Sequence, residues 1–188
     1  MELKSAASVS EFFQEVVSAA IRNQHVDTST FTECYLVNLL ANYTTASIDD
    51  EPLGLKLAQA ANAAPDERAR QLKDVGDTSL YLSGFFGEAL ERKLVGIDYY
   101  ISLGGAAYGE LARYFRLYRE AREFGDIYEE LGTKFTQFVD VLAEISEQTS
   151  VSSPASVVQL YERWLRTGSD WMERRLRQHG VVPKKESA

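Results

Sequence analysis

The chain has 188 residues, of which 45% are hydrophobic and 26% are charged, so it is long enough for one domain with a substantial core and is not a disordered sequence. Its formal net charge of −8 argues against general nucleic-acid binding, which depends on clustered Lys and Arg. The sequence has no apolar run of membrane-spanning length and no secretory signal pattern, and its single cysteine suits a reducing compartment, so we expect a cytoplasmic protein without a transmembrane segment.

Two helices are predicted in the first 50 residues, each from a capping pattern followed by apolar residues at helical spacing. Ser8 and Glu11 have the spacing of a capping box at the start of a helix over 8–24. The same pattern opens a second helix over 30–44. Cys34 lies beside the apolar stripe of that second helix, so we interpret it as a small core residue and not as a nucleophile.

The densest mixture of apolar, small and aromatic residues lies between 72 and 115, where we predict two closely packed helices over 66–87 and 98–122. Each glycine inside a helix costs about 1 kcal/mol relative to alanine. Close approach of two helix backbones would offset that cost. The two faces that we expect to meet are Gly76, Ser83 and Gly87 on the first helix and Gly105, Gly109 and Ala112 on the second.

The remaining chain also favours helices, and no stretch alternates in the manner of a strand. Gly125 is expected to interrupt the helical pattern. Residues 181–188 form a predicted disordered basic tail. Further helices are expected over 53–62, 127–148, 154–167 and 169–180. The sequence therefore predicts an all-α domain over residues 1–180, a bundle of about seven or eight helices packed around the central pair.

No catalytic or metal-binding motif stands out. The two histidines, His25 and His179, each lie near a predicted helix C-terminus, where capping of the negative helix end is the simplest role and axial haem ligation is the alternative. The pattern Glu-x-x-His of di-iron bundles does not occur. Residues 104–109 are rich in glycine but lack the ending of a phosphate-binding P-loop. We expect no metal and no cofactor.

One polar helix face is the best candidate for a ligand site. Asp77 lies on this face, and a buried carboxylate needs hydrogen-bond or charge partners. Tyrosine suits a pocket because it combines an apolar ring with a polar tip. The pocket that we expect is lined by Asp77, Tyr81, Tyr99, Tyr100 and Tyr108. The alternative is a buried polar group that fixes the register of the helices.

The C-terminal segment offers the candidate interface. Trp164 and Trp171 lie seven residues apart, on one face if their helix is continuous, and Arg174 follows them. From Glu162 onward seven basic residues stand against four acidic ones, a net of +3 that could contact an acidic partner or, more weakly, anionic lipid. The function expected is non-catalytic protein–protein contact by a homodimer. The alternative is a small-molecule-binding protein or enzyme that uses the Tyr/Asp pocket.

Overall fold

The computed structural model describes residues 2–43, 48, 51–87, 90, 95–118, 121–149, 161, 164–165, 168–178 and 182. Within these residues the ordered elements are helices and there are no strands, which confirms the predicted all-α bundle. The helices are α1 (Glu2–Asn23), α2 (Thr30–Tyr43), α3 (Leu53–Ala60), α4 (Pro65–Phe85), α6 (Ile97–Arg116), α7 (Arg122–Thr133), α8 (Phe135–Thr149) and α10 (Asp170–Gln178).

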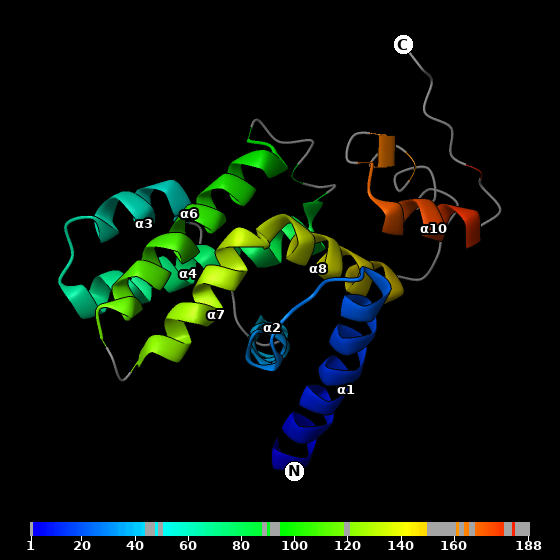
Figure 1. The fold of residues 1–188 in the computed structure, drawn as a ribbon, viewed down its shortest axis with the longest axis horizontal. Helices are drawn as coiled ribbons and strands as arrows, with labels where there is room; N and C mark the ends of the chain where they lie inside the picture. The colour runs from blue at the N-terminus through cyan, green and yellow to red at the C-terminus, as the bar shows by residue number, and fades with distance from the viewer. Residues whose placement is uncertain are drawn as a thin grey trace.

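Helix α6 lies at the centre of the packing, with its most extensive contacts to α4 on one side and to α7 on the other. This confirms the predicted central pair, with α4 and α6 in place of the ranges 66–87 and 98–122. Helices α3, α4, α6 and α7 gather in the left half of Figure 1, and α8 crosses the middle of the view. Helices α1 and α2 pack together, and α1 also contacts α8.

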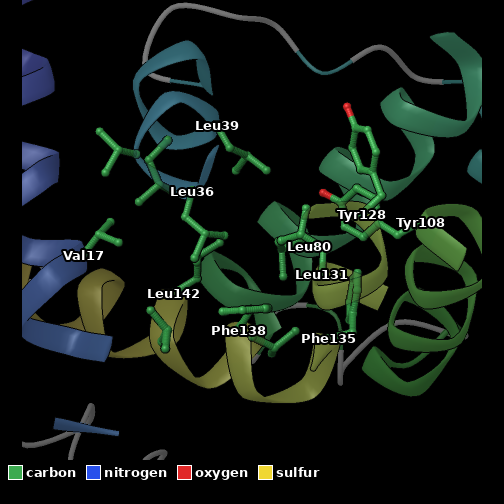
Figure 2. Packing of buried hydrophobic residues seen from close by; sticks show 14 of the residues in the cluster. Val17, Leu36, Leu39, Leu80, Tyr108, Tyr128, Leu131, Phe135, Phe138 and Leu142 are labelled. Atoms are coloured by element: carbon green, nitrogen blue, oxygen red, sulfur yellow. The ribbon is translucent and has the colours of Figure 1, made fainter. Parts of the chain in front are cut away.

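A single large hydrophobic cluster joins α1 through α8. In Figure 2, Phe135, Phe138 and Leu142 follow one another along α8, and Leu36 and Leu39 come from α2. All five side chains are buried. These apolar residues recur at helical spacing in the sequence, so both helices contribute to the same cluster, α2 packing mainly on α1 and α8 mainly on α4.

Small residues of the central pair do meet, at Ser79 and Gly104 and not on the two predicted faces: a Cβ on Gly104 of α6 would lie 2.7 Å from Cβ of Ser79 on α4. A Cβ on Gly76 would lie 2.5 Å from Cε1 of Tyr108, so this glycine makes room for an aromatic ring and not for a backbone. The predicted partner face is wrong: Gly105 and Gly109 pack against α7, where a Cβ on Gly132 would lie 3.3 Å from both Gly105 O and Gly109 N. Gly105 and Gly109 therefore allow the close approach of α6 to α7.

Four helix boundaries differ from the prediction. Helix α1 begins at Glu2, ahead of the capping box at Ser8, and α6 ends at Arg116. Gly125 does not interrupt a helix; it lies within α7, and its missing side chain lets α7 approach α6, since a Cβ there would lie 3.3 Å from Ala112 O. The helix predicted over 127–148 is broken at Lys134, which separates α7 from α8.

The N-terminus of α2 is capped by Ser29 and not by Thr30 and Glu33, the pair whose spacing predicted the cap. The Ser29 hydroxyl accepts the backbone N–H of Thr32 at 3.2 Å. Glu130 of α7 reaches across to accept hydrogen bonds from Ser29 and from the Thr32 hydroxyl, the latter at 2.6 Å. Cys34 is exposed, so the prediction that it is a core residue is wrong. The helix expected over 154–167 and the tail 181–188 lie almost entirely outside the described residues.

Candidate functional site

Asp77 of α4 is a buried carboxylate that binds side chains from α2, α4 and α6. Its Oδ1 accepts hydrogen bonds from the Tyr35 hydroxyl at 2.5 Å and from the Tyr108 hydroxyl at 2.8 Å. Its Oδ2 pairs with Nζ of Lys73, one helical turn earlier, at 2.5 Å. Asp77 is only 8% exposed and Tyr108 is fully buried. We call Asp77, Lys73, Tyr35, Tyr108 and Tyr128 the tyrosine cluster.

The rings of the tyrosine cluster pack on one another. Tyr108 and Tyr128 are stacked with their centroids 5.9 Å apart, and Tyr35 meets Tyr128 edge-on at 5.6 Å. Figure 2 shows Tyr108 and Tyr128 side by side above Phe135 of α8. Such pairs add to stability beyond the apolar area that they bury.

Burial controls the chemistry of these hydroxyls. Burial, followed by the negative charge of Asp77, raises the pKa of Tyr108 well above its ordinary value. Burial likewise raises the pKa of Tyr35, with further contributions from Tyr108 and Asp77. It raises the pKa of Tyr128 to about 12, against the opposing effect of a hydrogen bond with Tyr35. These phenols therefore stay protonated at neutral pH and serve as hydrogen-bond donors, not as bases.

The structure brings together only part of the predicted pocket. Asp77 and Tyr108 are in contact, whereas Tyr81 stacks on Tyr43 with ring centroids 4.3 Å apart. Tyr99 packs over α3, where a Cβ on Gly54 would lie 2.4 Å from its hydroxyl. Its ring meets that of Tyr100 edge-on at 5.4 Å.

Three members of the tyrosine cluster were missed by the sequence analysis: Tyr35, Tyr128 and Lys73. Lys73 and Asp77 have i, i+4 spacing, which is a readable signal for an ion pair on a helix. Tyr35 is 42 residues from Asp77 and belongs to the apolar stripe of α2, so no local pattern links the two. Among the described residues, no three metal-ligating side chains lie close enough to hold an ion.

A second feature is an exposed aromatic surface where α6 ends and α7 begins. Leu117 is 80% exposed, Tyr118 is 48% exposed and Phe124 is 55% exposed. We call these three residues, with Arg113 and Arg122, the α6–α7 corner. Neither arginine makes an ion pair or a side-chain hydrogen bond within the part of the chain that the structure describes.

Rings beneath the corner connect it to the core. Phe124 lies 5.8 Å from Phe115 between ring centroids, and Phe115 stacks on Tyr128 at 5.6 Å. Tyr118 lies 5.2 Å from Tyr114, whose hydroxyl donates to Asp66 at 3.2 Å. The exposed side chains of the corner therefore stand on a packed base.

A groove of about 500 Å³ adjoins the corner, between the start of α4 and the end of α6. Within it Arg68 pairs with Glu110 at 2.7 Å. Its lining residues are Ala63, Pro65, Arg68, Glu110, Arg113, Tyr114, Leu117 and Tyr118. A concave site of this size can hold one or two side chains of a partner.

The predicted tryptophan interface does not have the expected form. Trp164 is only 4% exposed and packs against Met172 and Leu176, so the prediction of an exposed anchor is wrong at this residue. Trp171 belongs to α10, and the non-helical residues Gly168 and Ser169 separate it from Trp164. Arg174 is exposed and donates a hydrogen bond to the backbone oxygen of Asn23 at the end of α1.

Together these observations define an all-α protein with a closed tyrosine cluster inside and an aromatic, arginine-bearing corner outside. None of the helices in the described ranges has both the length and the hydropathy needed to cross a bilayer. No protein-family model matches the chain, and no match was found among the curated proteins or the solved structures.

Proposed function

We propose that this is a non-catalytic cytoplasmic protein that acts through protein–protein contact, and that the α6–α7 corner is its contact surface. The observation that carries the proposal is the 80% exposure of Leu117 beside the exposed rings of Tyr118 and Phe124. Aromatic residues and arginine are enriched where protein interfaces concentrate their binding energy.

The packed base of the corner supports the same proposal. Phe124 packs against Phe115, and Tyr118 packs against Tyr114. Because these contacts already restrict the two exposed rings, they lose little conformational freedom when a partner covers them. A preorganised apolar surface of this kind binds more tightly than a loose one. Trp164, the residue expected to anchor a homodimer, is buried. The partner proposed for the corner is therefore a different protein and not a second copy of this chain.

The alternative function, a ligand pocket at Asp77, has weaker support. Both oxygens of Asp77 are engaged by side chains of the protein, and a ligand would have to displace Tyr35, Tyr108 or Lys73 to reach them. Breaking a buried hydrogen bond to a charged group costs about 1.5–3 kcal/mol. The geometry is that of a polar group that fixes helix register.

Photo-crosslinking in the source cells tests the proposal. Replacing Tyr118 with p-benzoylphenylalanine places a reactive group on the corner, and the same replacement at Phe12, an exposed residue of α1, is the matched control. We expect a discrete adduct with another protein from position 118 and none from position 12. Equal labelling from both positions, or no adduct from position 118, would refute the proposal.

A further inference from the structure

We infer that the groove beside the α6–α7 corner binds a peptide segment of a partner protein that carries a carboxylate next to an apolar anchor side chain. The inference rests on the proposed function and adds the chemistry of the partner. It uses two observations that the exposure of Leu117 does not include: the concave shape of the site and the distribution of charge around it.

Because the site is a groove, it can accept a protruding side chain of a partner, which a flat partner surface would not fill. The groove of about 500 Å³ is walled on one side by Ala63 and Pro65 and on the other by Tyr114, Leu117 and Tyr118. An aliphatic or aromatic side chain fits such a wall and would cover Leu117 and Tyr118. Burial of apolar area contributes about 25 cal/mol per Å², which makes this anchor the main source of affinity.

The charge of the site favours a peptide that carries an acidic residue next to that anchor side chain. Arg68 is already neutralised by Glu110, with their charged atoms 2.7 Å apart. Arg113, also on the groove, has no partner of this kind among the described residues. Among the described residues, Arg113 is thus the only arginine of the groove without a carboxylate partner. A carboxylate of a bound peptide can pair with Arg113, and an arginine–carboxylate contact can be bidentate.

The sequence around the corner strengthens this preference. From the groove residue Glu110 to Glu123 the sequence holds four arginines and three glutamates, a net of +1 in a chain whose net charge is −8. Arg116 pairs with Glu129, whereas Arg113 and Arg122 of the corner make no ion pair among the described residues, so the corner favours an acidic partner. The residues counted are Arg113, Arg116, Arg119, Arg122, Glu110, Glu120 and Glu123.

Two other occupants fit the site less well. A twofold contact between two copies, centred on Leu117, would bring the Arg113 and Arg122 side chains of both copies together, and like charges at an interface disfavour association. A membrane presents a broad layer of phosphate groups, which would meet Glu110 as well as Arg113. A peptide can place a single carboxylate on Arg113 and leave Glu110 with Arg68.

Selection from a random peptide display library, with the full-length chain as target, tests the inference. We expect the enriched peptides to combine Asp or Glu with Leu, Ile or Phe. The affinity of one enriched peptide is then measured by fluorescence anisotropy. Arg113→Glu and Leu117→Ser should each weaken its binding about tenfold or more. Arg22→Glu and Phe12→Ser on α1 are the matched controls, and both should leave binding unchanged.

Several outcomes would overturn the inference. Enrichment of basic or uncharged peptides, the absence of enrichment, or binding that survives both Arg113→Glu and Leu117→Ser would each do so. Flotation with vesicles of phosphatidylcholine and phosphatidylglycerol, lost in Leu117→Ser, would assign the site to a membrane. A dimer mass in light scattering, lost in the same variant, would assign it to a second copy. An adduct at position 118 without acidic peptides would refute this inference but not the proposed function.

Discussion

The ring of Tyr108 lies so close to Gly76 that a Cβ atom on the glycine would be 2.5 Å from Cε1 and 2.6 Å from Cδ1 of the tyrosine. This contact sets the distance between α4 and α6 and directs the Tyr108 hydroxyl to Asp77, which lies one residue further along α4. A glycine that weakens its own helix thus allows a buried aromatic ring to reach its hydrogen-bond acceptor.

Gly76→Ala should therefore destabilise the protein. The added methyl group would force a rigid, buried ring to move, and such overpacking costs about 1–3 kcal/mol even after the better helix propensity of alanine is included. Gly109→Ala is the matched control, since a Cβ there meets no atom within 4 Å, and it should be neutral or stabilising by up to about 1 kcal/mol. Urea unfolding followed by circular dichroism measures both changes.

Asp77→Ala should lower the free energy of unfolding by about 2–4 kcal/mol, because the buried hydroxyls of Tyr35 and Tyr108 would lose their acceptor. Tyr108→Phe should cost about 1–2 kcal/mol. A double-mutant cycle between Asp77 and Tyr108 should show clear coupling. Tyr81→Phe is the control, and it should change stability by less than about 0.5 kcal/mol. Additive effects at Asp77 and Tyr108 would show that their hydrogen bond contributes little.

High pH should destabilise the protein through the tyrosine cluster. The pKa of Tyr128 is raised from 10.0 to about 12 in the folded state, so the folded protein holds this proton more tightly than the unfolded chain. The corresponding stability is fully present below pH 10 and is lost as the pH rises toward 12. Ultraviolet absorbance of tyrosinate should rise first from the exposed tyrosines and then, with unfolding, from the buried ones. Tyr128→Phe should reduce this loss of stability, whereas Tyr118→Phe should not.

Low pH should weaken the cap that Glu130 places on α2. Burial raises the pKa of this carboxyl, but hydrogen bonds from Thr32, Lys134 and Ser29 outweigh that effect and lower the pKa from 4.5 to about 2. The stabilisation is present above pH 4.5 and is lost as the pH falls toward 2. Since the carboxylate keeps some contact with water, we expect about 1–2 kcal/mol at neutral pH.

Glu130→Gln tests this dependence. Its deficit relative to the wild type should be largest above pH 5 and should disappear near pH 2, measured by urea unfolding across that range. Glu15→Gln, at an exposed position in the middle of α1, is the control and should show a much smaller deficit. A deficit of constant size at every pH would contradict the assigned role of the charge.

The sequence was sufficient for the helical class and for the pairing of α4 with α6, because small and apolar residues recur there at helical spacing. The partner of Gly105 and Gly109 was not predictable, since a small face shows that something approaches closely but not which helix does. Asp77 was identified from the cost of burying a carboxylate. Tyr35 was not, because its position beside Asp77 depends on the packing of α2.

The α6–α7 corner escaped prediction for a different reason. Tyr114 and Tyr118 continue the 3–4 spacing of the helix before them, so the sequence predicts one continuous helix to 122. Neither glycine nor proline marks the end of α6 at Arg116, and Gly125, the residue that did suggest a break, lies within α7. The exposure of Leu117 follows from that turn and is visible only in the folded chain.

The central claim, that function belongs to the corner and stability to the tyrosine cluster, is tested most directly by one comparison. The yield of the photo-crosslinked adduct at position 118 is measured in Leu117→Ser and in Tyr108→Phe, together with the free energy of unfolding of each variant. We predict that Leu117→Ser abolishes the adduct with unchanged stability, and that Tyr108→Phe keeps the adduct with reduced stability. An adduct that survives Leu117→Ser but disappears in a folded Tyr108→Phe protein would contradict the claim.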